Sequence, residues 1–167
     1  QNPIEMEGTY PLPEAQRDRF MTRITMGYPS RDSELEMLER HGAHNPLDEL
    51  YPVTHGERIT ELIDVVGSVY VADVVKDYLV NIVAATRSHD AVRLGASPRA
   101  SLHLIRTARA KAALAGRDYV IPDDVQAMAI PVLAHRLLPS TRAQLDGISP
   151  VDIVSQILTS TPVPEQV

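Results

Sequence analysis

Residues 71–89, VADVVKDYLVNIVAATRSH, carry the pattern that decides the fold of this chain. Apolar side chains recur three or four positions apart, which is the spacing of one face of an α-helix, over about four turns. The members of this apolar face are Val71, Val74, Val75, Tyr78, Leu79, Ile82 and Ala85. The stretch therefore predicts a long amphipathic helix that buries one face in a core.

The segments on both sides of this helix begin with helix-capping residues. A serine or threonine before a helix accepts hydrogen bonds from its first free N–H groups, and proline suits the first helical position because it has no N–H to satisfy. Ser97 and Ser149 each precede a proline, and Thr54 with Glu57 matches a capping box. Further helices are therefore expected over residues 31–42, 59–69, 98–115 and 122–137 and from residue 150, with residues 43–53 as a loop or broken helix.

The first 20 residues, QNPIEMEGTYPLPEAQRDRF, differ from the rest because they carry many polar groups around three prolines and a glycine. This composition predicts a polar loop followed by a short charged helix, and such loops often carry binding or catalytic groups. The alternation in residues 20–26, FMTRITM, predicts a half-buried strand that ends at Gly27. The chain starts at Gln1 without an initiator methionine, and we expect it to be a piece of a longer protein.

The composition favours helices packed through aliphatic side chains and argues against several classes of protein. The chain has 167 residues, of which 44% are apolar, with one Phe and no Trp. Its net charge of −6 argues against a dedicated nucleic-acid binder, whose surface is basic. The absence of cysteine excludes disulfides and Cys-based zinc sites, and no apolar run approaches the ~20 residues of a membrane span. These features indicate a mainly α, soluble protein of the cytoplasm.

Arg99 is a candidate for binding an anion on the basis of its position alone. It follows Ser97 and Pro98 and so lies in the first turn of a predicted helix, where the helix dipole disfavours a cation. A phosphate bound at the same helix end would compensate for that repulsion. Arg99, His103 and Arg106 follow one another at helical spacing and form one basic stripe, for which a solvated, salt-bridged surface is the alternative interpretation.

Other chemistries are less favoured by the sequence. His41, His44 and His55 lie around Asp48 and Glu49, and a folded loop could bring them together as metal ligands. Loop histidines on an acidic surface are the commoner case, however, and we expect no metal site. A self-contained hydrolase needs a nucleophile, a base and an orienting group, whereas the serines here are mostly accounted for as helix caps. The main alternative to nucleotide sensing is a non-catalytic helical protein-interaction module.

Five strings, in order along the chain, resemble the MoxR family of AAA+ ATPases: QNPIEMEGTYPLPEAQRDRF, GYPSR, ATRSHDAVRLGASPRAS, GRDYVIPDDV and HRLLP. The resemblance covers nearly the whole chain and implies the back half of the ATPase module. It implies that residues 1–28 are the C-terminal edge of the nucleotide-binding α/β core. Residues 29–167 would then form a helical lid domain of about five helices.

The same resemblance implies roles for individual residues. Asn2 matches sensor 1, whose amide can orient the attacking water against the γ-phosphate. Arg19 matches the arginine finger, which acts in trans on the ATP of a neighbouring subunit, although the nearby Arg17 could compete for this role. Arg99 matches sensor 2, which contacts the ATP phosphates.

The resemblance also implies the activity of the full-length protein. That protein would be an ATPase that binds ATP and Mg²⁺, assembles with itself into a ring, for which a hexamer is expected, and helps client complexes to mature or become active. Proteins with von Willebrand factor A-type domains are the implied partners, and neither nucleic acid nor a membrane span is expected. This chain contains no GxxxxGK[ST] phosphate loop and no Walker B acids, so we expect it to be inactive alone and to hold no nucleotide tightly.

Overall fold

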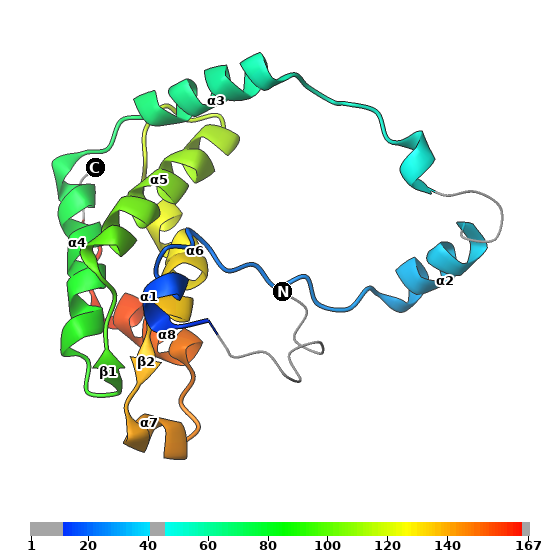
Figure 1. Ribbon diagram of the computed structural model, residues 1–167. Coiled ribbons are helices and arrows are strands. Elements are labelled where there is room, and N and C mark those ends of the chain that lie inside the picture. Colours follow the sequence, from blue (N-terminus) through cyan, green and yellow to red (C-terminus); the bar gives the residue numbers. More distant parts are fainter. Residues whose placement is uncertain (1–11, 41–45, 165–167) are drawn as a thin grey trace. The chain divides into compact units, whose positions relative to one another are not determined.

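The computed structural model describes residues 12–40 and 46–164, and most of these residues lie in helices (Figure 1). The helices are α1 (Glu14–Arg17), α2 (Arg31–Arg40), α3 (Gly56–Ser68), α4 (Asp73–Ser88), α5 (Pro98–Leu114), α6 (Pro122–Leu133), α7 (Thr141–Leu145) and α8 (Pro150–Ser160), with 3₁₀ turns η2 (Pro46–Glu49) and η3 (Ala134–Arg136). Strands β1 (Val92–Leu94) and β2 (Leu138–Pro139) form an antiparallel pair, with Val92 opposite Pro139. The mainly α fold expected from the sequence is confirmed.

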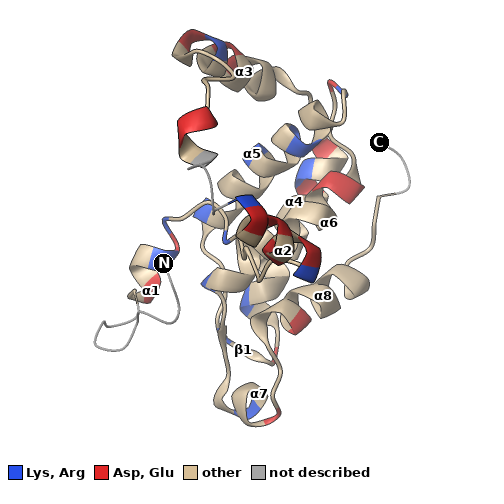
Figure 2. Ribbon diagram, turned by 90° about the vertical axis from the view of Figure 1, so that its right-hand side faces the viewer, with Lys and Arg blue, Asp and Glu red and all other residues tan. Residues whose placement is uncertain are grey.

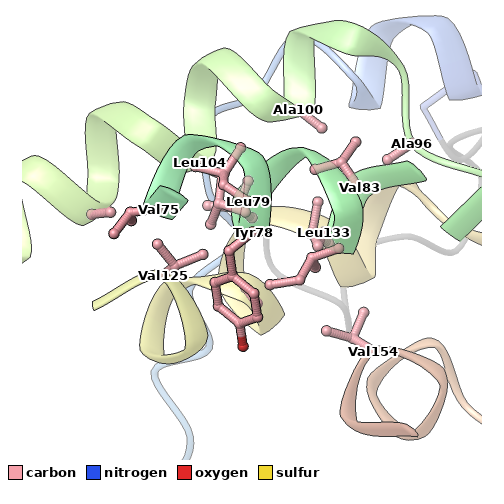
Figure 3. Close-up of a cluster of buried hydrophobic side chains, with 14 of the residues drawn as sticks. Val75, Tyr78, Leu79, Val83, Ala96, Ala100, Leu104, Val125, Leu133 and Val154 are labelled. Atoms are coloured by element: carbon pink, nitrogen blue, oxygen red, sulfur yellow. The ribbon is translucent and has the colours of Figure 1, made fainter. Parts of the chain in front are cut away.

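The chain divides into two compact units, residues 1–23 with 65–167 and residues 24–64. In the first unit α4, α5, α6 and α8 pack against one another around one core. Figure 3 shows Val75 and Leu79 of α4 facing Leu104 of α5, with Val125 and Leu133 of α6 beneath them and Val154 of α8 beside them. Full burial of such aliphatic side chains contributes about 1.5–3 kcal/mol each, so this core holds the unit together.

The Ala-rich composition of α5 has a packing reason. Ala100, Leu104, Ala108 and Ala112 lie four positions apart, so they share one face of the helix, and all four are fully buried. Small side chains let a neighbouring helix approach closely, and α6 is the element that contacts α5 most extensively. α5 is thereby fixed on the core along its whole length.

Local signals placed most of the helix starts correctly. Ser149 and Asp152 form the capping box of α8, in which the Ser149 hydroxyl accepts from the Asp152 N–H and the Asp152 carboxylate accepts from the Ser149 N–H. α6 starts at Pro122 as expected, ends at Leu133 and continues as the 3₁₀ turn η3 to Arg136, so the last turn of the helix expected to about residue 137 is 3₁₀ and not α. The short helix α7 and the β1–β2 pair were not predicted.

The strand expected over residues 20–26 is wrong. Residues 20–30 form no regular element, and Ile24 and Met26, expected to face a core, are 78% and 92% exposed. A strand persists only where its N–H and C=O groups pair with a neighbouring strand, and no strand within the described ranges pairs with this segment. Instead the N–H of Arg23 donates to the carbonyl of Pro131 in α6, at 2.9 Å.

The second unit contains α2, η2 and most of α3. Ser30 precedes α2 and accepts a hydrogen bond from the N–H of Ser33, as expected for a cap. Figure 2 shows charged residues of both signs along α2, which buries none of its residues. α3 has an apolar face that includes Ile59, Leu62 and Ile63, and it likewise buries no residue. The stable core of the described chain therefore lies in the first unit.

Candidate functional site

Asp18 is the point at which three distant parts of the first unit meet. Its carboxylate accepts hydrogen bonds from the Ser97 hydroxyl at 3.0 and 2.9 Å to its two oxygens. Arg99 Nη1 donates to Oδ2 at 3.3 Å, and Arg136 Nε donates to Oδ1 at 3.1 Å. One carboxylate that directly follows α1 therefore binds the start of α5 and the end of η3 together.

The start of α5 is held in place by the end of α4. The N–H of Ala96 donates to the buried Thr86 hydroxyl at 3.0 Å, and Arg87 Nε donates to the carbonyl of Ala96 at 2.8 Å. Gly95 lies so close to α4 that a Cβ atom on it would come within 2.6 Å of the Thr86 carbonyl oxygen. This tight turn fixes Ser97, and with it the direction in which Arg99 leaves the helix.

Ser97 occupies the cap position of α5 as expected, but its hydroxyl does not cap the helix. The hydroxyl accepts no hydrogen bond from the N–H groups of the first turn, and it donates to the Asp18 carboxylate. Asp18 therefore brings a negative charge to the N-terminus of a long helix, where the helix dipole favours an anion. The structure thus uses this end of α5 as an anion-binding position.

Arg136 holds the segment that follows α1 through its backbone. Its side chain is 1% exposed, and Nη2 donates to the carbonyl oxygens of Phe20 at 2.5 Å and Asp18 at 3.2 Å. Nη1 donates to the carbonyl of Met21 at 3.4 Å. A guanidinium with five N–H donors in a fixed plane can serve several carbonyls at once, so Arg136 fixes the main chain of residues 18–21.

The remaining partners of Arg136 lie inside the helical unit. Nη1 also donates to the carbonyl of Val132, and Nη2 lies 2.5 Å from Nδ1 of His103. Burial lowers the pKa of the Arg136 guanidinium, while the Asp18 carboxylate nearby raises it. Because arginine is so strongly basic, Arg136 keeps its charge and Asp18 is its counter-ion.

Two buried histidines accompany Arg136, and both are neutral near pH 7. Burial and the charge of Arg136 lower the pKa of His103 below its ordinary value of 6.5, so its Nδ1 can accept a hydrogen bond from the guanidinium. Burial likewise lowers the pKa of His135, whose Nε2 lies 3.2 Å from the Phe20 carbonyl. The expected basic stripe is therefore broken, since His103 is turned inward and uncharged.

The predicted site residues have different environments. Arg99 lies in the first turn of α5, half exposed, and pairs with Asp18. Arg19 is exposed, and none of the described residues forms a hydrogen bond or ion pair with its side chain. Arg17 is less exposed and pairs with Glu14 at 3.9 Å. Asn2 lies outside the described residues.

Arg19 forms no ion pair with the neighbouring acids Asp18 and Glu14. Asp18 is bound by Ser97, Arg99 and Arg136, and Glu14 is bound by Arg17. The guanidinium of Arg19 is thus left available to a partner outside the described chain. Arg17 and Arg19 therefore differ in their environments, since Arg17 pairs with Glu14.

The metal-site alternative has no support in the described residues. His41 and His44 lie outside them, His55 is exposed, and no group of three or more His, Asp or Glu side chains in residues 12–40 and 46–164 could hold a metal ion. In the same ranges, every helix is too short or too polar to cross a bilayer.

Sequence reasoning missed Asp18 and Arg136 as parts of the site. One signal was present, because Arg136, together with His135, interrupts an apolar run that extends from Ala129 to Leu138. A charged residue in such a run has to be paired when it is buried. The identity of the partner could not be found in this way, because Asp18 lies 118 positions earlier in the chain.

Comparisons with known proteins agree with this arrangement. A sequence model described as an AAA lid domain matches residues 84–157, and one described as the ATPase family associated with various cellular activities (AAA) matches residues 1–22. The first match includes Arg99 and Arg136, and the second includes Asp18 and Arg19. The contacts of Asp18 therefore join the end of an AAA core sequence to an AAA lid.

Relatives align with nearly the whole chain. YeaC of Bacillus subtilis is 46% identical over 166 residues, and the chaperone MoxR1 of Mycobacterium tuberculosis is 41% identical over 174 residues. Both alignments cover 99% of this chain, but 52% of YeaC and 46% of MoxR1. The MoxR protein of Paracoccus denitrificans is 30% identical over 184 residues.

A solved structure has the same fold. The crystal structure of a protein from Cytophaga hutchinsonii that was assigned as an ATPase superposes with a TM-score of 0.90 at 34% identity. It covers 99% of this chain, which in turn covers 53% of that protein. The chain spans about half the length of the curated relatives it matches. With its AAA lid preceded by the end of an AAA core, this chain belongs to the MoxR family of AAA ATPases.

Proposed function

We propose that this chain is the sensing and trans-acting part of a MoxR-type ATPase that uses ATP hydrolysis for chaperone-like maturation or activation of client complexes. The observation that carries the proposal is the pair of cations around Asp18. Arg99 lies at an anion-binding helix end, and Arg19 next to Asp18 projects without a partner among the described residues. The relative MoxR1, which is named a chaperone, supports the client-directed part.

In this proposal three residues act on ATP. Asn2 is sensor 1, which orients the attacking water, and Arg99 is sensor 2, which contacts the phosphates of ATP bound in the same protein. Arg19 reaches the ATP of the neighbouring subunit and stabilises charge on the transferring phosphoryl group. Mg²⁺ supplies charge neutralisation at the phosphates when it is bound there. Asp18 supports the fit of Arg99 to a phosphate, because its carboxylate is an anion that Arg99 already binds at that helix end.

The proposal extends to domains, partners and location. Residues 1–28 would belong to the edge of the core and residues 29–167 to the lid, since the two family matches lie on either side of that boundary. The intact protein would act in the cytoplasm as a ring of identical subunits, a hexamer by family resemblance. A protein with a von Willebrand factor A-type domain would work beside it.

Substitution of Arg19 in the intact protein tests the proposal. Arg19→Ala should leave ATP binding near normal while turnover falls by about 10³–10⁵, the effect of an arginine finger in related NTPases, or on the order of 4–7 kcal/mol of barrier. Mixing with a subunit whose phosphate loop is inactivated should restore some activity, because that subunit still offers a normal Arg19. Arg17→Ala is the matched control and should keep most of the turnover.

Wild-type turnover by Arg19→Ala would contradict the finger assignment. It would favour the alternative of a non-catalytic helical interaction module, for which the exposed apolar face of α3 is the supporting observation. If Arg17→Ala loses turnover and Arg19→Ala does not, the finger is Arg17 and the rest of the proposal stands.

A further inference from the structure

The segment that follows α1 is bound through its main chain to one small region of the lid. The carbonyls of Asp18, Phe20 and Met21 all accept hydrogen bonds from Arg136 in η3. The chain then continues to Arg23, whose N–H donates to the carbonyl of Pro131 in α6 at 2.9 Å. These backbone bonds hold residues 18–23 against α6 and η3.

A second side chain strengthens the same attachment. His135, next to Arg136, places Nε2 3.2 Å from the Phe20 carbonyl, so this carbonyl receives donors from both residues. His103 of α5 accepts from Arg136 through Nδ1 and keeps the guanidinium plane directed at the segment. Because a neutral imidazole can accept in this way and a protonated one cannot, the lowered pKa of His103 suits the arrangement.

Arg19 lies in the middle of this attached segment. Its backbone neighbours, Asp18 and Phe20, are both bound by Arg136, whereas its own side chain is exposed and has no partner within the described residues. A side chain that is free at its tip and fixed at its base is well placed to enter a site on another molecule. The order of the segment comes from α6 and η3, not from Arg19 itself.

We propose that Arg136 is a positioning residue for Arg19, which it fixes to the lid so that the finger moves with the lid. This inference rests on the proposed function of Arg19 as the finger. The Asp18 carboxylate also binds Arg99, so one carboxylate joins the sensor for a subunit's own ATP to the finger offered to its neighbour. Movement of the lid on loss of a phosphate would thus shift the finger of the same subunit.

The test uses Arg136→Gln in the intact ATPase. Glutamine has two N–H donors where arginine has five, so it cannot hold all three carbonyls, and the segment should loosen while the ATP site of the same subunit stays intact. We expect kcat to fall about 100-fold, the effect of a misplaced catalytic group, with the KM for ATP unchanged. Mixing with subunits whose phosphate loop is inactivated should restore turnover, because those subunits present a normally positioned Arg19.

Arg117→Gln is the matched control. Arg117 forms another partly buried ion pair, with Asp124, and its hydrogen-bond partners, Asp124 and the Tyr119 carbonyl, lie outside residues 18–23. Its substitution should lower stability without the loss of kcat. Hydrogen exchange gives a readout independent of activity: the amide of Arg23 should lose protection in Arg136→Gln and keep it in Arg117→Gln.

The outcomes separate this inference from the function on which it rests. Wild-type turnover of Arg19→Ala would overturn the finger itself. A large, rescuable loss in Arg19→Ala together with wild-type turnover of Arg136→Gln would overturn only the positioning role. A loss in Arg136→Gln that mixing fails to restore would also overturn it, because the defect would then lie in the variant's own ATP site or fold.

Arg136→Lys keeps the inference testable if Arg136→Gln does not assemble. Lysine preserves the charge opposite Asp18, but its single ammonium cannot reproduce the planar set of bonds to the backbone carbonyls. We expect a rescuable loss of kcat of about 10-fold, with reduced protection of the Arg23 amide. Full turnover with unchanged exchange would overturn the proposal.

Discussion

Two arginine–aspartate pairs of the helical unit are alike in chemistry and differ in what they connect. Arg117 and Asp124 are seven positions apart and form two hydrogen bonds, of 2.7 and 2.6 Å. Arg136 and Asp18 are 118 positions apart, and their side chains share one bond of 3.1 Å. The tighter pair joins neighbours in the chain, and the looser pair joins the end of an AAA core sequence to an AAA lid.

The difference shows that the geometry of an ion pair does not indicate its function. Asp124 provides a hydrogen-bond acceptor at the start of α6, since its carboxylate also accepts from the Ile121 N–H at 3.0 Å. Burial alone would raise the pKa of Asp124, but the hydrogen bonds from Arg117 and Ile121 outweigh it and lower that pKa. The partners of Asp124 are all close to it in the sequence, so this pair stabilises only the start of α6 and the turn before it. Arg136 instead donates to three backbone carbonyls of a distant segment, those of residues 18, 20 and 21.

The largest effect on stability is expected for Asp124→Ala. The substitution leaves the guanidinium of Arg117 without its carboxylate and the N–H of Ile121 without an acceptor. Removing one partner of a buried pair costs about 3 kcal/mol or more, which for a chain of this size lowers Tm by roughly 6–12 °C. Thermal unfolding of the 167-residue chain measures the change.

Asp123→Ala provides the control for this prediction. Asp123 lies in the same first turn of α6 and is exposed, so its loss should change Tm little. In the intact protein Asp124→Ala should keep its kcat, unlike Arg136→Gln. Equal Tm changes for the two aspartates, or a rescuable loss of kcat in Asp124→Ala, would remove the distinction between the two pairs.

The second prediction concerns pH and the histidine that supports Arg136. Burial and Arg136 lower the pKa of His103 in the folded protein, so the unfolded chain binds a proton more readily. His103 should therefore cost no free energy of unfolding above pH ~6.5. The free energy of unfolding should fall as the pH drops below that value towards the lowered pKa of His103 in the folded protein. Unfolding between pH 8 and pH 5 measures the slope.

His103→Asn should make that slope shallower. The asparagine side-chain oxygen can accept from Arg136 in place of Nδ1, and it does not titrate. Part of the slope should remain, because burial lowers the pKa of His135 as well. The exposed His55→Asn is the control and should leave the wild-type slope unchanged. A slope equally steep in His103→Asn would show that His103 does not contribute.

The difference between local and distant partners also explains which features could be predicted from the sequence. Helix starts are set by neighbouring residues, so the cap at Ser149 before Pro150 was visible in the sequence and is confirmed. The apolar face of residues 71–89 is confirmed too at Val75, Tyr78, Leu79 and Ile82. Its spacing follows from the geometry of a single helix, whatever packs against it.

Features that depend on distant partners could not be predicted. Ser97 satisfies every local rule for a cap, yet its hydroxyl donates to Asp18, 79 positions away. The alternation in residues 20–26 is strand-like, but a strand needs a neighbour, and Arg23 bonds to α6 instead. His103 has the spacing of a basic stripe, and only the position of Arg136 makes it a neutral acceptor.

The smallest effect on stability is expected for Arg99→Ala. The side chain of Arg99 is 49% exposed and makes one bond of 3.3 Å to Asp18. Pairs of this kind contribute about 0–1 kcal/mol and weaken as salt rises. The Tm of the chain should therefore fall by roughly 4 °C at most. Asp18 retains Ser97 and Arg136 as donors, so its position should hold.

Arg99→Ala should change ATP binding much more than it changes stability. Hydrogen bonds between charged groups are worth about 1.5–3 kcal/mol, so loss of a phosphate contact should weaken ATP binding to the intact protein about tenfold or more. Arg106→Ala is the control, because Arg106 lies on the same side of α5 two turns further on and is exposed. Unchanged affinity together with unchanged turnover in Arg99→Ala would leave Arg99 with no role beyond its weak pair with Asp18. A selective loss of affinity would instead show that Arg99 contributes to ATP binding, although in the structure it pairs with Asp18.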